Sequence, residues 1–228
     1  VFGNNYLNTV LHFASPYIGR RIREHYEANH LESSFLLTML FQRKKRGMAL
    51  GGNFFEFVAH SILCSGGGFP VRTLPDGRSA TSMTRMSPLL ALAHLLVPKL
   101  TQFFFGMDTN IEWHNAYYYQ PIDAYFPVLD SIAVFHDQVF IFQMTVSDVH
   151  VFSWTKLDEL LKHFKCPFRK VNLVFVVPKH VLPTFYPEYR DEQPSHLEIT
   201  TSALGISHEV VLKAISTTKS AEIPYFLR

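Results

Sequence analysis

Two apolar runs separated by only two residues constrain the fold of this chain most strongly. Val128–Phe135 and Gln138–Val146 are rich in β-branched and aromatic residues, which is typical of β-strands. A two-residue turn at His136-Asp137 would pair the runs antiparallel and set Asp130 opposite Gln143. Cross-strand partners have Cβ atoms about 4.5–5.5 Å apart, so a carboxylate and an amide would converge there. A three-residue turn would shift this register by one residue.

The sequence after the hairpin predicts a helix and a parallel strand. Phe152–Phe164 places apolar residues on one helical face and charged residues on the other. Val171–Val177 is almost entirely apolar, as expected for a strand that is buried on both faces. Because a strand, a helix and a strand in succession usually join parallel strands, we predict an α/β fold with a mixed sheet flanked by helices. Leu197–Thr200 is expected to add an edge strand, and Ser207–Ser216 a last helix capped by Ser207.

The first 63 residues are predicted to be mainly helical. Apolar spacing indicates three helices, at Tyr17–Asn29, Leu31–Phe41 and Asn53–Leu63. The glycine-rich Ser65–Gly68 should end the third helix as a turn. We interpret residues 1–228 as a single domain, with residues 1–48 as an N-terminal helical extension and residues 65–110 as an insertion. A strand at Tyr117–Tyr119 should follow, packing on both of its faces.

Composition excludes several classes of protein. Hydrophobic residues make up 47% of the 228 residues, which is too many for a disordered chain. Cys64 and Cys166 are too few for a disulfide scaffold and lack the spacing of a zinc site, so we expect both to fill the core. No apolar run reaches the roughly 18–20 residues that cross a bilayer. The chain begins at Val1, and we expect a fragment without its targeting segment.

One short basic block stands out against a small net charge. The formal charge is +2, which does not by itself indicate a nucleic-acid partner. Arg43, Lys44, Lys45 and Arg46 nevertheless follow one another directly. Such a block fits a solvated helix end, a nuclear import signal or a contact with phosphate groups.

Three oxygen-bearing side chains fall on elements that should be neighbours. Glu56 lies on the third predicted helix, and Asp130 and Gln143 lie on paired strands. Carboxylate and amide oxygens are the ligands that a hard cation such as Mg²⁺ (or Mn²⁺) prefers. Such an ion supports phosphodiester hydrolysis, because it activates water and offsets charge on the phosphate.

The chain also resembles a known family through an ordered series of motifs. The motifs are Gly52-Asn53-Phe54-Phe55-Glu56 with His60, Tyr117-Tyr118-Tyr119-Gln120-Pro121, Phe126-Pro127-Val128-Leu129-Asp130-Ser131, Phe142-Gln143-Met144-Thr145-Val146-Ser147 with His150, and Phe175-Val176-Val177-Pro178-Lys179. In this order they resemble the C-terminal effector domain of Crinkler proteins, and trypanosomal retrotransposon hot spot proteins share the pattern. The resemblance runs from about Ser15 to Phe185.

The resemblance implies a restriction-endonuclease-like fold of the PD-(D/E)XK group, with an α-β-β-β-α-β core. It also implies a secreted virulence effector that acts on DNA in the nucleus of a host cell. Glu56 matches the acid on the helix, and Asp130 matches the acid of the second strand. Gln143 stands where the family usually has Glu or Asp, and Thr145 stands at the lysine position of the E-x-K signature.

Both departures weaken the expected site. Glutamine can bind a cation through its carbonyl oxygen but brings no charge, and threonine cannot replace an ammonium group. Lys179, which follows the buried strand, could supply the missing cation, and Lys156 is a weaker candidate. His150 could act as a general base or bind phosphate. Each also has an ordinary interpretation as a solvated or loop residue.

Two functions therefore remain open. The first is a magnesium-dependent DNA endonuclease, with Asp130, Gln143 and Glu56 as metal ligands. The second is a nuclease-fold module that has lost turnover and binds double-stranded DNA or a host nuclear protein. The missing lysine favours the second function, whereas the two acids beside an apolar sheet favour the first.

Overall fold

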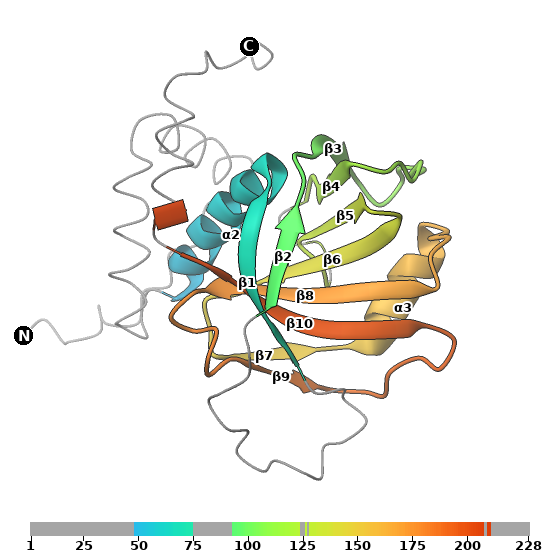
Figure 1. The fold of residues 1–228 in the computed structure, drawn as a ribbon. Helices are drawn as coiled ribbons and strands as arrows, with labels where there is room; N and C mark the ends of the chain where they lie inside the picture. The colour runs from blue at the N-terminus through green and yellow to red at the C-terminus, as the bar shows by residue number, and fades with distance from the viewer. Residues whose placement is uncertain (1–47, 75–92, 124–125, 127, 208, 211–228) are drawn as a thin grey trace, which may run out of the picture.

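A computed structural model describes residues 48–74, 93–123, 126, 128–207 and 209–210 of the 228-residue chain. Its elements in chain order are α2 (Met48–Ser65), β1 (Gly67–Thr73), β2 (Ala93–Val97), β3 (Thr101–Phe105), β4 (Tyr117–Pro121), β5 (Ser131–Phe135), β6 (Gln138–Met144), β7 (Val149–Phe152), α3 (Trp154–His163), β8 (Lys170–Pro178), β9 (Tyr186–Tyr189) and β10 (Glu198–Ile206). The described part is thus an α/β fold with a large mixed sheet (Figure 1).

The predicted hairpin and its register are confirmed. β5 and β6 pair antiparallel with Val134 opposite Val139, and β8 extends the hairpin in parallel beside β6. His136 and Asp137 both have positive φ, at 52° and 56°. Such angles belong to a type I′ turn, whose twist matches that of the flanking strands. The two-residue turn therefore forms without the glycine that commonly occupies it.

The eight-stranded sheet is strongly curled. Its order is β2-β1-β10-β8-β6-β5-β4-β3, yet only residues 98–100 separate the two edge strands, β2 and β3, in sequence. The four Cα steps from Val97 to Thr101 cover at most about 14 Å, whereas a flat sheet of this order would place its edges about 34 Å apart. The edges must therefore approach each other, and the sheet wraps around α2 (Figure 1).

Curling gives the sheet two different faces, each with its own apolar core. The concave face, called the α2 face below, packs Phe55, Ile62 and Leu63 of α2 against residues such as Tyr118 and Phe142. The opposite face, called the α3 face, packs the buried side of α3 against residues such as Tyr119, Leu173 and Phe175. Because successive strand residues point to opposite faces, Tyr118 and Tyr119 enter different cores, as expected for a strand that packs on both sides.

Each helix ends or begins at a well-defined residue. Gly66 ends α2 with φ of 76°, and a Cβ atom there would lie only 2.7 Å from the backbone of Pro98, so only glycine fits. The helix begins at Met48, earlier than predicted, and runs through Gly51 and Gly52. At α3, Ser153 caps the first turn by accepting the Lys156 backbone N–H.

Several predictions about the sheet were incomplete or wrong. β10 is a central strand between β1 and β8, not the predicted edge strand at Leu197–Thr200. Of the predicted turn at Ser65–Gly68, Gly67 and Gly68 instead begin β1. Residues 65–110 contribute β1, β2 and β3 to the sheet. The division into an extension and an insertion stays a prediction.

Some predicted elements fall outside the described residues. These are the helices at Tyr17–Asn29 and Leu31–Phe41 and most of the helix at Ser207–Ser216. The Ser207 Oγ does accept the Val210 backbone N–H at 3.4 Å, as a capping serine should. Both cysteines are free and pack beside the cores. No helix within the described ranges is long and apolar enough to cross a membrane.

Candidate functional site

Asp130 lies at the end of the hairpin, one residue before β5. Its backbone N–H donates to the Phe142 carbonyl at 3.0 Å. Its Oδ2 atom accepts a hydrogen bond from Gln143 Nε2 at 2.9 Å and another from the Met144 backbone N–H. The predicted approach of Asp130 and Gln143 is confirmed by this contact. The carboxylate replaces a backbone carbonyl as the hydrogen-bond partner of Met144. It therefore satisfies the last backbone N–H of β6 at the end of the β5–β6 pair.

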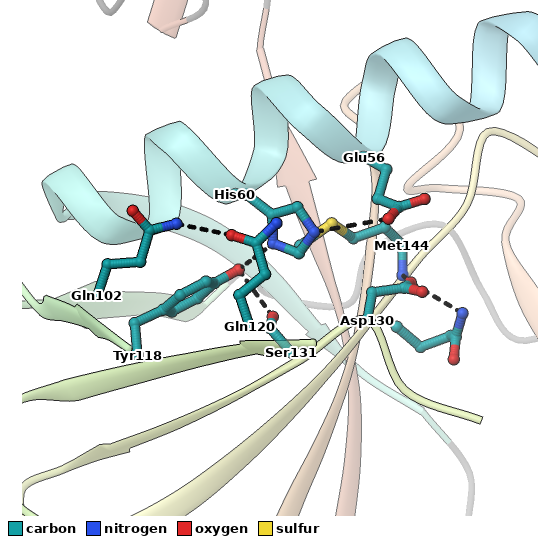
Figure 2. A network of polar contacts seen from close by, with 9 residues as sticks. Glu56, His60, Gln102, Tyr118, Gln120, Asp130, Ser131 and Met144 are labelled. Carbon is teal, nitrogen blue, oxygen red and sulfur yellow. Dashed lines mark hydrogen bonds and ion pairs between the residues drawn. The ribbon is translucent and has the colours of Figure 1, made fainter. Parts of the chain in front are cut away.

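Glu56 of α2 is the second acid of this region. It lies beside Asp130 and His60 under the helix (Figure 2), and its charge, together with burial, raises the pKa of Asp130 well above the ordinary value near 3.8. Burial is the larger cause, and the Met144 N–H opposes it only in part. Two acids are therefore close enough to repel each other, which a proton or a cation would relieve.

A row of buried polar side chains starts from Glu56. His60, one helical turn later, places Nε2 3.6 Å from Glu56 Oε1. Its Nδ1 lies 2.7 Å from the Tyr118 hydroxyl, which also accepts a hydrogen bond from Ser131 Oγ at 2.7 Å (Figure 2). Burial raises the pKa of Tyr118 well above its ordinary value near 10, so the phenol keeps its proton.

Gln143 approaches Asp130 from the other face of the sheet. It is paired with Phe175 of the α3 face, whereas its neighbour Met144 packs in the core of the α2 face. The amide presents nitrogen to the carboxylate. Rotation of the amide by half a turn would present oxygen, the atom that a cation needs.

Thr145 and Lys179 lie at the same end of the sheet. The Thr145 N–H donates to Val176 at 3.0 Å, and its hydroxyl accepts the Ser147 N–H at 3.1 Å. Lys179 is exposed, and its Cα packs against Gly205 of β10, on the side of β8 away from β6. Among the described residues, no hydrogen bond or ion pair joins Lys179 to Asp130 or Glu56.

The remaining candidates lie farther from the two acids. His150 of β7 packs its ring on Phe175 of the α3 face, with centroids 5.8 Å apart, and burial lowers its pKa. Lys156 is exposed on the first turn of α3. No ion pair or hydrogen bond within the described ranges connects either side chain to Asp130. The basic block Arg43–Arg46 lies outside the described residues.

The donor chemistry around Asp130 fits a hard cation. Carboxylate oxygens of Asp130 and Glu56 and the carbonyl oxygen of a rotated Gln143 are the ligand types that Mg²⁺ and Mn²⁺ select. The described residues contain no cluster of three His, Cys, Asp or Glu side chains arranged to hold a metal ion. A cation here would therefore depend on two charged ligands, the neutral amide and water.

Sequence reasoning placed the acids but missed the row that links them. His60 entered the sequence analysis only within the motif of Glu56, and Tyr118 was interpreted only as a packing residue. The signal that was available is the spacing of four between Glu56 and His60, which aligns them on one helical face. The contact with Tyr118 could not be predicted, because it depends on β4 passing beneath α2.

A comparison with known protein families, curated proteins and solved structures finds no match to this chain.

Proposed function

We propose that this chain is a metal-dependent nuclease-fold domain that hydrolyses phosphodiester bonds in DNA, with Asp130 and Glu56 at its centre. The observation that carries the proposal is the placement of these acids side by side at the sheet end, where burial and then the charge of Glu56 raise the pKa of Asp130. Placing two partly buried carboxylates this close together is costly unless a proton or a cation offsets their repulsion. Perturbed carboxylates of this kind are typical of functional sites.

The order of the elements supports the same proposal. We infer that α2, β4, β5, β6, α3 and β8 correspond to the restriction-endonuclease-like core of the PD-(D/E)XK group. These strands are adjacent in the order β8-β6-β5-β4, and the connection from β6 to the parallel β8 contains α3, preceded by the short strand β7. In that core the acids come from the first helix and the second strand, which here are the positions of Glu56 and Asp130.

In this proposal the chain's own residues hold the cation and the substrate phosphate in place. Asp130 and Glu56 would bind Mg²⁺ or Mn²⁺ through carboxylate oxygens, and Gln143 through Oε1. The bound ion would supply an activated water molecule and offset charge on the phosphate. Thr145 gives the site no positive charge, so we expect slow turnover unless Lys179 or a residue outside the described ranges provides one.

A second function has an observation of its own. The Gln143 amide donates to Asp130, which satisfies this carboxylate without a metal ion. A nuclease-fold module that binds double-stranded DNA or a host nuclear protein, and cleaves nothing, would keep this arrangement. Action in a host nucleus after secretion belongs to both proposals and rests on the family resemblance.

Cleavage of supercoiled plasmid with Mg²⁺ or Mn²⁺ tests the first proposal. We expect nicking by the wild type and its loss, by about 100-fold or more, in Asp130→Asn and in Glu56→Gln. Asp137→Asn is the matched control for Asp130, because Asp137 is an exposed aspartate in the turn of the same hairpin. Glu159→Gln, on the exposed side of α3, is the control for Glu56.

The outcomes separate the two functions. Cleavage that depends on the metal and on both acids supports the nuclease. No cleavage, or equal cleavage by all five proteins, would overturn it. The same samples should then be titrated with duplex DNA at several salt concentrations, because contacts with phosphate groups make binding weaken steeply with salt.

A further inference from the structure

The buried polar row beneath α2 is unusual for a helix–sheet interface. His60, Tyr118 and Ser131 are only 4%, 0% and 0% exposed, and aromatic and aliphatic side chains surround them. Burying such groups costs free energy unless they are hydrogen-bonded. Apolar residues of similar size would fill these positions without that cost. Packing alone therefore does not account for three polar side chains here.

One arrangement of hydrogen atoms gives both buried hydroxyls of the row an acceptor. Ser131 Oγ donates to the Tyr118 hydroxyl at 2.7 Å. A phenol has one hydrogen, so Tyr118 donates it to its other partner, Nδ1 of His60, at 2.7 Å. Nδ1 must then be an acceptor, and a neutral imidazole carries its hydrogen on Nε2. This is the nitrogen that faces Glu56 Oε1 at 3.6 Å.

The row also connects the two acids. Ser131 directly follows Asp130 in the chain, and Glu56 lies at the opposite end of the row on α2 (Figure 2). The contacts therefore tie α2 to β4 and to the start of β5. A shift of α2 along its axis would break them and would move Glu56 relative to Asp130.

We propose that His60 is a positioning residue that holds the Glu56 carboxylate beside Asp130, and that Tyr118 and Ser131 fix His60 in the Nε2–H tautomer. The consequence for metal binding rests on the proposed nuclease function. The tautomer of His60 and its dependence on Tyr118 do not rest on that function and can be tested without it. Partners that orient a ligand in this way typically change metal affinity by about 10–100-fold when they are removed.

The first test is the tautomer itself. Long-range ¹H–¹⁵N spectra of ¹⁵N-labelled protein distinguish a protonated from a bare imidazole nitrogen, and a His60→Gln variant assigns the signals. At neutral pH we expect His60 to show a bare Nδ1 and a protonated Nε2. In Tyr118→Phe, the Nδ1 signal should move toward that of an unbonded nitrogen.

The neighbouring tyrosine supplies a matched control. Tyr119 is also buried, and its hydroxyl also makes two hydrogen bonds, but on the α3 face. Tyr119→Phe should therefore leave the His60 signals unchanged. An Nδ1–H tautomer or a doubly protonated ring in the wild type, or equal shifts in both tyrosine variants, would overturn the assignment.

The second test is Mn²⁺ binding, measured by calorimetry on the metal alone. We expect His60→Leu, which fills the position with an apolar side chain but has no donor, to weaken Mn²⁺ binding by about tenfold or more. His60→Gln keeps an N–H donor at a similar reach and should bind more tightly than His60→Leu. A packing role predicts the opposite order, because leucine suits the apolar surroundings better, and that order would overturn the positioning role.

The two proposals fail in different ways. If wild-type protein binds no Mn²⁺, the metal-dependent function is overturned, and the imidazole spectra alone decide the role of the row. If Mn²⁺ binds equally to the wild type and to folded His60→Leu, His60 does not position Glu56, although the metal site stands. Thermal unfolding of each variant identifies any that fail to fold. Ser131→Ala, which removes only the hydroxyl bonded to Tyr118, then tests the same row with a smaller change.

Discussion

Two adjacent residues of β4 show how the faces of the sheet differ. Tyr118 and Tyr119 are both buried, and each hydroxyl makes two hydrogen bonds. Among the described residues, the hydroxyl of Tyr119, on the α3 face, bonds only to backbone groups, the His114 N–H and the Glu112 carbonyl. The hydroxyl of Tyr118, on the α2 face, bonds only to side chains in the part of the chain that the structure describes, and His60 connects it to Glu56.

The difference suggests that the two faces of the sheet have different roles. A hydroxyl that satisfies backbone groups fixes a loop, which any fold needs. A hydroxyl in a side-chain row holds other side chains in a defined orientation, which a binding site needs. We therefore expect the apolar core beside α3 to determine stability alone, and the core beside α2 to determine both stability and metal binding.

The largest effect should come from removing one core leucine on each face. Leu63 of α2 and Leu157 of α3 are 0% and 1% exposed, and each Leu→Ala change should lower the free energy of unfolding by about 2–5 kcal/mol. Only Leu63→Ala should also weaken Mn²⁺ binding, because α2 carries Glu56 and His60. Urea unfolding and calorimetry measure the two quantities. Equal loss of Mn²⁺ affinity in both variants would remove the distinction between the faces.

A smaller effect should come from Asp191, which follows β9 and whose carboxylate caps the start of α3. Its carboxylate accepts hydrogen bonds from Ser153 Oγ at 2.6 Å and from the backbone N–H groups of Trp154 and Thr155. Asp191→Ala should therefore lower the free energy of unfolding by about 1–2 kcal/mol and leave Mn²⁺ affinity unchanged. The exposed Asp148 is the control, and Asp148→Ala should stay within about 0.5 kcal/mol of the wild type.

The contribution of Asp191 should also depend on pH. Burial alone would raise its pKa, but the hydrogen bonds from Ser153, Thr155 and Trp154 lower it below the ordinary value near 3.8. An acid with a lowered pKa in the folded state stabilises the fold above its ordinary pKa and loses this effect as pH falls. The difference between wild type and Asp191→Ala should therefore shrink below about pH 4. A difference that does not change with pH would show that these hydrogen bonds do not favour the charged form.

These local features show how far the sequence could predict the fold. The hairpin register, the helix carrying Glu56 and the parallel strand β8 were predictable, because apolar periodicity and short connections determine them. The curl of the sheet was not predictable, because it depends on the order in which all eight strands pair. This order places β2 and β3 at the two edges, although they are neighbours in sequence. The central position of β10 was missed for the same reason, since only three of its residues, 198–200, were assigned to a strand.

The candidate site was predictable to a similar extent. Asp130 and Gln143 followed from the hairpin register, which is a local property of two neighbouring runs. The row of His60, Tyr118 and Ser131 joins residues up to 71 positions apart, from one helix and two strands. Such contacts depend on how a helix lies on a sheet, and residue spacing within one element does not contain that information.

Asp130 should give the α2 face the opposite pH dependence from that of Asp191. Its pKa is raised, so between about pH 4 and that raised value the folded protein binds more protons than the unfolded chain. The free energy of unfolding of metal-free protein should therefore fall as pH rises, by at most about 1.4 kcal/mol per pH unit. Asp130→Asn should remove this slope in urea unfolding at a series of pH values, and Asp137→Asn should keep it. Mn²⁺ affinity should rise over the same window, because the cation needs the ionised carboxylate.

The smallest change with a clear direction is Gln143→Glu, which restores the acid expected at this position. A third carboxylate beside Asp130 and Glu56 should destabilise the metal-free protein slightly, because like charges repel. It should also tighten Mn²⁺ binding severalfold, since a charged ligand replaces a neutral amide. Gln138→Glu is the matched control: it makes the same change at the exposed far end of β6, where neither effect is expected. Lower stability without tighter Mn²⁺ binding would indicate that the end of the hairpin holds a proton rather than a cation, and would favour the module that binds without cleaving.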